Sequence, residues 1–444
     1  MSTAVRSTGG ADRSAPNHVH DVLAEHILAD GFPMVLDLDR SKGVRLVDAR
    51  DGAVLLDMFG FFASSALGMN HPDLVDDRAF RDELAAVAAN KPSNSDIYSV
   101  PMARFVETFA RVLGDPSLPH LFFVDGGALA VENALKAAFD WKSRLNETRG
   151  LDPALGTRVL HLTEAFHGRT GYTMSLTNTD PVKTDRFPKF DWPRIDAPYL
   201  CEGRDVVAAE GHALAQARVA FAAHPHDIAC FVAEPIQGEG GDNHFRPEFF
   251  RAMEQLCREH DALLIVDEVQ TGVGMTGTTW AYQQLGIAPD IVAFGKKTQV
   301  CGIMAGGRLD DVPENVFAVS SRLNSTWGGN LTDMVRARRI LEVIERDRLV
   351  DRARLTGAHL LAGLRHLATV HPTVTEPRGR GLMCAITLPT GEFRDAVLTR
   401  LYRDEHVLMI GSGERSIRFR PPLTVTTAEL DEALDALDRV LAAS

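Results

Sequence analysis

Cysteine, basic charge and long apolar runs are all scarce in this chain of 444 residues, and each scarcity excludes a class of protein. No CxxC pair occurs among the five cysteines, so we expect reduced thiols and not a disulfide framework. The formal net charge is -13, without the basic stripe of a nucleic-acid binder. No apolar run approaches the roughly 18 residues that span a bilayer.

Signal-peptide and metal-site patterns are missing as well. The N-terminal stretch MSTAVRSTGGADRSAP has no apolar centre, so we expect residues 1–20 to be a flexible tail and the protein to be cytoplasmic. No HExxH motif or Cys/His cluster has metal-ligand spacing, and HPHD at 224–227 is expected to be a loop before a strand. Neither nucleic acid nor a membrane is an expected partner.

What the middle of the chain does contain is short apolar runs that alternate with helical patterns. This alternation predicts an α/β fold with a mostly parallel sheet covered on both faces. Ligands of such sheets bind just beyond the carboxyl ends of the strands. Polar and glycine residues follow the apolar runs HLFFV, ALLIV and DIVAF at those ends.

The last hundred or so residues have a different pattern, which predicts a smaller α+β lobe. The stretch from TDMVRARR to LRHLA is expected to be long amphipathic helix, and GLMCAITLP and SIRFRPPLTV are expected strands. Thr426 and Glu429 have the spacing of a capping box. The helix that follows places four leucines on one face: Leu430, Leu434, Leu437 and Leu441.

Asp267 and the pair Lys296–Lys297 each end an apolar run that is predicted to be a strand. A buried carboxylate such as Asp267 needs a partner, which could be a salt bridge, a helix terminus or the pyridine nitrogen of pyridoxal phosphate. A lysine in a dry site loses proton affinity and can form a Schiff base, whereas a solvated surface pair is the usual fate of two adjacent lysines. Adjacent parallel strands would bring Asp267 and the lysines to one edge of the sheet.

Two further strand ends carry groups that suit a flat phosphorylated cofactor. Gly126 and Gly127 precede a helical pattern whose free N–H groups can bind phosphate. Phe166 and His167 follow another strand, where Phe166 could stack on a cofactor ring or simply pack in the core.

Nucleotide-binding motifs fail at specific positions. A GxxxxGK[ST] loop that ends at Lys296 would need glycine where Asp290 stands and serine or threonine where Lys297 stands. No GxGxxG follows an early strand, and no GxSxG is present for an α/β-hydrolase.

Four stretches, IVDEVQTG, PDIVAFGK, FHGRT and STWGGN, occur in the order and spacing typical of one family. From about residue 30 to its end, the chain resembles the fold-type I, class III (ω-amino acid) aminotransferases. The resemblance implies a large α/β domain over 71–330 that binds pyridoxal 5'-phosphate. It implies a small domain built from residues 21–70 and 331–444, and a homodimer with active sites at the subunit interface.

Several stretches, among them DGGALAVENALK and GKKTQVCGIMAGG, depart from the commoner forms of the family and resemble a lysine-specific subgroup. This implies transfer of the ε-amino group of L-lysine to 2-oxoglutarate. The products would be L-glutamate and 2-aminoadipate 6-semialdehyde, which cyclises to a piperideine carboxylate. Ornithine, acetylornithine and 4-aminobutyrate are alternative donors, and a cofactor-binding regulatory protein is an alternative class.

The resemblance also implies roles for residues that would bind the cofactor. Lys296 would form the Schiff base and Asp267 would pair with the pyridine nitrogen, while Lys297 would turn away. The remaining cofactor contacts would be Gln270 near the phenolic oxygen, Gly127 and Ala128 at the phosphate, Phe166 on the ring and Thr326 at the partner subunit's phosphate.

The substrate residues follow from the same resemblance. Arg418 would bind the α-carboxylate of glutamate; Arg420 lies on the same side of the predicted strand, so periodicity alone cannot choose between the two. Glu239 would neutralise Arg418 during the lysine half-reaction, and its glycine neighbours would allow it to move. Arg169 would bind the distal carboxylate, unless its role is structural. Gln270 and Asn324 complete the expected substrate contacts.

Overall fold

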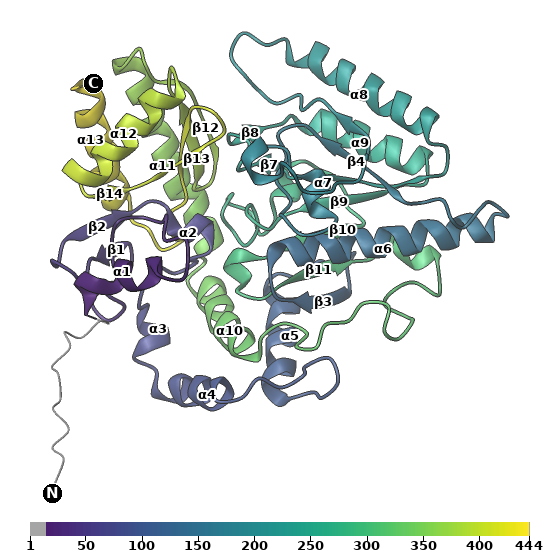
Figure 1. The fold of residues 1–444 in the computed structure, drawn as a ribbon, viewed down its shortest axis with the longest axis horizontal. Helices are drawn as coiled ribbons and strands as arrows, with labels where there is room; N and C mark the ends of the chain where they lie inside the picture. The colour runs from purple at the N-terminus through teal and green to yellow at the C-terminus, as the bar shows by residue number, and fades with distance from the viewer. Residues whose placement is uncertain (1–14, 444) are drawn as a thin grey trace, which may run out of the picture.

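The computed structural model describes residues 15–443, and the chain forms two lobes (Figure 1). Most of the expected N-terminal tail, residues 1–14, lies outside the described residues. The rest of that tail is helical, because a 3-10 turn, η1 (Pro16–His18), leads into α1 (Val19–Ala24).

The larger lobe contains a seven-stranded sheet of order β3-β11-β10-β9-β6-β4-β5. Its strands are β3 (His120–Val124), β4 (Arg158–Leu162), β5 (Arg194–Ile195), β6 (Ile228–Ala233), β9 (Leu263–Asp267), β10 (Ile291–Phe294) and β11 (Cys301–Ala305). Pairing is parallel from β10 to β5, and only β11 runs antiparallel to its neighbours β10 and β3. The predicted α/β fold with a mostly parallel sheet is confirmed.

Helices cover both faces of this sheet, which explains why its central strands are continuous apolar runs. One face packs against α6 (Gly127–Thr148), whose alanines face β9, β10 and β11. The other face packs against α5 (Val100–Val112), α8 (Val206–Ala223) and α9 (Pro247–Glu259).

Shorter elements complete the larger lobe. They are α3 (Pro72–Val75), α4 (Arg78–Ala88), α7 (Thr173–Leu176), β7 (Ile236–Gln237), β8 (Asn243–His244), η2 (Pro181–Lys183), η3 (Ala281–Gln284), η4 (Lys296–Thr298) and η5 (Gly307–Asp311). The only helical element between Asp267 and Lys296 is the single turn η3. Even so, β9 and β10 pair in parallel with Asp267 opposite Ala293, so their carboxyl ends meet at one edge.

The smaller lobe joins both ends of the chain. A sheet of order β1-β2-β14 pairs β1 (Arg45–Val47) and β2 (Val54–Asp57) with β14 (Val407–Leu408). A second sheet has the order β12-β13-β16-β15. Its strands and the lobe's helices are β12 (Thr375–Arg380), β13 (Met383–Thr387), β15 (Ile410–Ser412), β16 (Ser416–Phe419), α2 (Gly60–Ala63), α11 (Leu349–Val370), α12 (Gly391–Asp404) and α13 (Thr427–Ala442).

The prediction of long helix from TDMVRARR to LRHLA is wrong in one respect, because this stretch forms two helices. The first, α10 (Leu331–Arg346), ends just before Arg348, whose φ of 51° is left-handed and interrupts the helical hydrogen-bond ladder before α11 begins. The first helix packs against α4 and α5 of the larger lobe (Figure 1), so the expected domain boundary at residue 330 stays a prediction. The capping box of Thr426 and Glu429 is confirmed at the start of α13.

Candidate active site

A cavity of about 1290 Å³ opens at the carboxyl ends of the parallel strands. It collects eight of the predicted site residues: Gly127, Ala128, Phe166, Arg169, Glu239, Asp267, Gln270 and Lys296. Asp267 ends β9, and the other seven lie in the segments that follow β3, β4, β7, β9 and β10. All of these strands except β7 belong to the large sheet, which binds ligands at this edge.

Asp267 is the last residue of β9 and is 5% exposed. Its Oδ2 lies 2.8 Å from Nδ1 of the buried His167, and its Oδ1 accepts a hydrogen bond from the Val269 N–H at 3.0 Å. Burial lowers the pKa of His167, but the hydrogen bond and charge of Asp267 outweigh this and raise that pKa above its usual value. The Asp267 carboxylate is thereby held at the cavity wall, where it can pair with a cationic nitrogen.

Glu234 is a site residue that sequence reasoning missed. It follows β6 and is buried, and its two carboxylate oxygens accept hydrogen bonds from the N–H groups of Phe166 and Gly238, each at 3.0 Å. Burial raises the pKa of Glu234 to about 7. The side chain therefore ties together two cavity-lining loops, and only the fold shows this because Phe166 is distant from Glu234 in sequence.

The two adjacent lysines have different environments. Lys296 lines the cavity and has a φ of 55°, a left-handed conformation that non-glycine residues rarely adopt and that clusters at functional sites. Burial lowers the pKa of Lys296 to about 8, and the charges of Arg418 and Arg420 lower it in the same direction. Lys297 is 1% exposed and turns away, donating to the Gln270 carbonyl oxygen at 3.2 Å. The solvated surface pair is thereby excluded.

The amino end of α6 faces the cavity. Gly126 precedes the helix with a φ of 102° and has no side-chain cap, so the first N–H groups are directed at the cavity. A Cβ on Gly127 would lie 2.9 Å from Val269 Cγ1, which shows how closely the backbone approaches the neighbouring loop. A helix terminus of this kind binds phosphate through its N–H groups and its dipole.

Pyridoxal phosphate fits these groups. Asp267, fixed by His167, supplies the anion for a pyridine nitrogen, and the amino end of α6 supplies phosphate donors. Lys296 supplies an amine whose lowered pKa favours the nucleophilic form. The Gln270 side chain is held at the cavity because its Oε1 accepts from Nε and Nη2 of Arg420, at 3.1 Å and 3.0 Å.

The structure separates the two candidate arginines of β16 and its end. Arg418 is buried, and its Nη2 donates to Glu239 Oε2 at 2.8 Å, while Glu239 lines the cavity. Arg420 forms an ion pair with Asp242, and both of these side chains are fully buried. Glu239, the carboxylate paired with Arg418, is thus accessible from the cavity, whereas Asp242, the carboxylate paired with Arg420, is not.

Glu239 is held by a second cation. Lys183 Nζ donates to its Oε1 at 2.7 Å. Burial raises the pKa of Glu239, but the charge of Arg418 and the hydrogen bond and charge of Lys183 outweigh this and lower it to about 2. Sequence reasoning missed Lys183, which lies more than fifty residues before Glu239 on η2.

The glycines around Glu239 have a different role from the one expected. A Cβ on Gly238 would lie 2.2 Å from Gln270 Oε1, and a Cβ on Gly240 would lie 2.2 Å from the Glu164 carbonyl oxygen. The Glu239 carbonyl oxygen also accepts from Gly413 N–H at 3.0 Å. Gly238 and Gly240 thus permit close packing of the backbone around Glu239, which favours movement of its carboxylate by side-chain torsions.

A left-handed turn forms another part of the cavity wall. The four residues of α2, from Gly60 to Ala63, have φ values of 53°, 51°, 57° and 67°. Each non-glycine residue in this conformation costs roughly 1–2 kcal/mol. The turn places the ring centroid of Phe62 5.8 Å from Arg418 Cζ, so it brings an aromatic face to the buried arginine.

Three predicted substrate or cofactor residues have no partner group at the cavity in this chain. Arg169 lines the cavity and is exposed, with no hydrogen bond or ion pair from its side chain to any residue of 15–443. Asn324 and Thr326 are exposed and lie outside the cavity lining. Their expected roles stay predictions.

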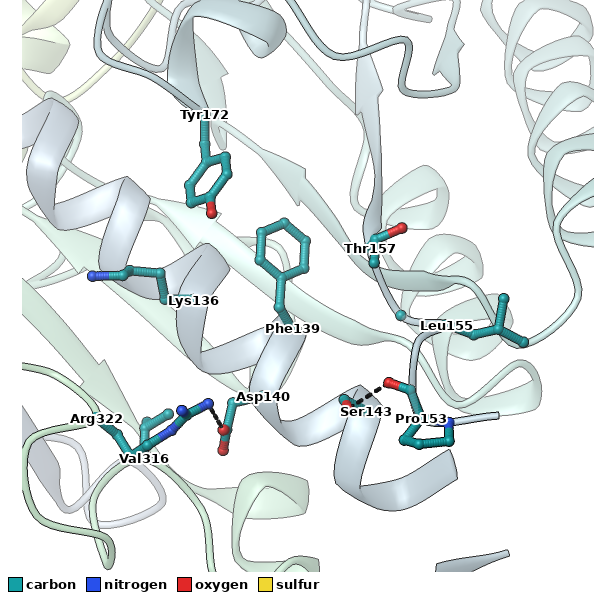
Figure 2. A pocket seen from close by; sticks show the side chains of 11 residues that line it. Lys136, Phe139, Asp140, Ser143, Pro153, Leu155, Thr157, Tyr172, Val316 and Arg322 are labelled. Carbon is teal, nitrogen blue, oxygen red and sulfur yellow. Dashed lines mark hydrogen bonds and ion pairs between the residues drawn. The ribbon is translucent and has the colours of Figure 1, made fainter. Parts of the chain in front are cut away.

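A second cavity, of about 350 Å³, lies along the carboxyl-terminal half of α6 (Figure 2). Its wall includes Phe139, Tyr172 and the ion pair between Asp140 and Arg322, and none of the predicted site residues line it. Between residues 15 and 443 no three His, Cys, Asp or Glu side chains gather as metal ligands. Over the same range, no helix combines the length and apolar character needed to cross a membrane.

The chain is similar in sequence and in fold to known proteins. Residues 28–441 match the family described as Aminotransferase class-III. The L-lysine-epsilon aminotransferase of Mycobacterium tuberculosis is 66% identical over 99% of both chains. That of Amycolatopsis lactamdurans is 62% identical over 96% of this chain and 95% of the relative. A solved structure of a lysine aminotransferase from M. tuberculosis in the internal aldimine form has a TM-score of 0.96, with 67% identity over 97% of this chain and 100% of that one.

Proposed function

The chain belongs to the class-III aminotransferases, and on that premise we propose that it transfers the ε-amino group of L-lysine to 2-oxoglutarate, with pyridoxal 5'-phosphate as its cofactor. The products are L-glutamate and 2-aminoadipate 6-semialdehyde, which cyclises to a piperideine carboxylate. Sequence identity above 60% over nearly the full length to proteins named for this activity supports the choice of lysine.

The observation that carries the proposal is the carboxylate of Glu239 on Arg418. An ω-amine donor such as lysine has no carboxylate next to its reacting carbon, so a bare arginine there would be an unpaired buried charge. Glutamate has an α-carboxylate at that place and can bind the arginine in a bidentate manner. A counter-ion built into the protein therefore allows one site to accept both substrates.

The cofactor's groups have candidate partners in this chain. Asp267 would pair with the ring nitrogen, Gln270 would face the phenolic oxygen and Phe166 would pack on the ring. Gly127 and Ala128 would donate N–H groups to the phosphate, and Thr326 would reach the phosphate in the partner subunit. When bound, pyridoxal phosphate supplies an electron sink for the carbon that loses a proton.

Lys296 has two tasks in this proposal. Its neutral Nζ is the amine that anchors the cofactor and that the substrate amine replaces. Once released, Nζ would move a proton from the ε-carbon of lysine to the C4′ carbon of the cofactor, acting as general base at the first carbon and as general acid at the second. A pKa of about 8 suits both tasks, because the neutral and protonated amines are both populated around pH 8. Arg169 would hold the distal carboxylate of either substrate, and Asn324 would contact the substrate from its loop.

We also propose a homodimer with shared active sites and a cytoplasmic location. Large apolar side chains are exposed near the loop that carries Thr326: Ile97, Tyr98, Val100 and Trp327 are each at least 45% exposed. That loop is tied to this apolar group through the hydrogen bond from Ser95 to the Ser325 carbonyl oxygen. Exposed apolar groups of this kind are typical of subunit contacts. Sedimentation of the holoenzyme tests the dimer, and a monomer at micromolar concentration would contradict it.

A panel of amino donors tests the function. The purified holoenzyme is incubated with 2-oxoglutarate and either L-lysine, L-ornithine, N-acetylornithine or 4-aminobutyrate, and glutamate is measured. We expect L-lysine to have the highest kcat/KM and its product to be the cyclic imine. A higher kcat/KM for another donor would replace lysine as the substrate, and no reaction with any donor would contradict the activity.

A further inference from the structure

The Glu239 carboxylate is held on both oxygens by two different cations. Oε2 accepts from Arg418 Nη2 at 2.8 Å, and Oε1 accepts from Lys183 Nζ at 2.7 Å. The two cations come from different lobes, because Arg418 lies on β16 of the smaller lobe and Lys183 lies on η2 of the larger lobe.

The two cations differ in their access to the cavity. The Arg418 side chain is 2% exposed and is further fixed by a bond from Nη1 to the Gly238 carbonyl oxygen at 3.3 Å. The Lys183 side chain is 23% exposed, lines the cavity and lies with its Nζ 5.4 Å from the ring centroid of Phe166. Lys183 therefore stands beside the expected cofactor site, while Arg418 lies behind Glu239.

This arrangement bears on how Glu239 can leave Arg418. The backbone on both sides of Glu239 is closely packed, so the carboxylate moves by side-chain rotation. A carboxylate that leaves its counter-ion in a partly buried site pays a desolvation cost unless another cation is within reach. Lys183 already binds the oxygen that does not contact Arg418.

We propose that Lys183 is the positioning residue that keeps the Glu239 carboxylate paired when Arg418 binds the α-carboxylate of glutamate. The inference rests on the proposed function. It names the residue that allows Glu239 to leave Arg418 for one substrate and to return to it for the other. Lys183 lowers the free energy of the state in which Glu239 has left Arg418, so it favours amino donors and acceptors with a carboxylate beside the reacting carbon. Its effect on donors that lack this carboxylate is smaller, because Glu239 then stays on Arg418.

The test compares three variants of the holoenzyme with the wild type in single-turnover half-reactions, one with L-lysine and one with L-glutamate. Lys183→Met removes the cation and keeps much of the side-chain volume, whereas Lys183→Arg keeps the cation. Lys189→Met is the matched control, since Lys189 is an exposed lysine a few residues away whose Nζ lies 3.5 Å from Thr184 Oγ1 and contacts no carboxylate among residues 15–443.

We expect Lys183→Met to lower kcat/KM for glutamate roughly tenfold more than kcat/KM for lysine, the size of a lost charged hydrogen bond. The quantity to compare is the ratio of kcat/KM for glutamate to kcat/KM for lysine. In Lys183→Arg this ratio should return most of the way to the wild-type value, and in Lys189→Met it should equal the wild-type value. A merely structural role would lower both half-reactions alike, and that result, or equal loss in Lys189→Met, would overturn the inference.

Failure of the proposed function gives a different result. A wild-type enzyme that reacts with glutamate but not with lysine would contradict lysine as the donor. The kcat/KM for glutamate is then divided by the kcat/KM for whichever ω-amine donor the panel identifies. If Lys183→Met has the same ratio as the wild type, the role proposed for Lys183 is overturned.

Discussion

Arg418 donates a hydrogen bond from Nη2 to Glu239 Oε2 across 2.8 Å, and this contact joins a fully enclosed cation to a carboxylate that lines the active-site cavity. The charge of Arg418 is therefore paired with a carboxylate of the protein itself. In the proposed function, Arg418 binds the substrate carboxylate only when Glu239 turns away. If the proposed function holds, the position of the Glu239 side chain governs which substrate binds in each half-reaction.

Glu239→Gln should impair the lysine half-reaction more than the glutamate half-reaction. The amide has no charge, so Arg418 is left as an uncompensated cation whenever the substrate has no α-carboxylate near it. We expect kcat/KM for lysine in single-turnover measurements to fall at least about tenfold, the range of one charged hydrogen bond. Equal losses with the two substrates would argue against a neutralising role.

Lys296→Ala should abolish both the visible absorption band of the bound cofactor and transamination, because no other amine stands at the end of β10 inside the cavity among residues 15–443. Lys297→Met is the matched control: it removes a neighbouring amine that points to the Gln270 carbonyl and keeps most of the buried volume. We expect the control to retain the band in an absorption spectrum. A band that survives in Lys296→Ala and disappears in Lys297→Met would reverse the two assignments.

Capture of the cofactor by the apoenzyme should depend on pH with a midpoint near 8. The reactive form of Lys296 is the neutral amine, and its fraction rises as pH increases through the lowered pKa of about 8. The rate constant followed by stopped-flow absorbance should therefore rise from pH 7 and level off above pH 9. A rate that still increases tenfold per unit at pH 9.5 would indicate an ordinary lysine.

Gly60→Ala should destabilise the folded protein. The position has a φ of 53°, and a Cβ would lie 2.1 Å from the Arg420 carbonyl oxygen. We expect the free energy of unfolding to fall by roughly 2 kcal/mol or more. Gly211→Ala is the control, because Gly211 lies inside α8 with open space around it and should gain about 0.5–1 kcal/mol. Denaturant titration of both variants decides this, and equal stabilities would exclude strain at Gly60.

The sequence was most informative where local pattern and chemistry coincide. Asp267 and Lys296 could be placed at a common edge because each follows an apolar strand, and parallel pairing brings those ends together. The same kind of signal predicted the capping box at Thr426 and the glycine turn before α6. In these cases the determining contacts lie within a few residues in the chain or in adjacent parallel strands.

Contacts between distant segments could not be predicted. His167, Lys183 and Glu234 are single polar residues outside the strands and the long helices, and their roles depend on partners 56 to 100 residues away. The break at Arg348 and the left-handed turn at Phe62 have no such cue either, because a charged or bulky residue gives no local indication of positive φ. Tertiary packing imposes both conformations.

Isotope transfer tests the central claim most directly. The holoenzyme is given 2-oxoglutarate with L-lysine that carries ¹⁵N either at the ε-position or at the α-position, and the label in glutamate is measured by mass spectrometry. The account predicts ¹⁵N-glutamate from ε-labelled lysine and unlabelled glutamate from α-labelled lysine. Label transfer from the α-position, or no labelled glutamate from either substrate, would contradict it.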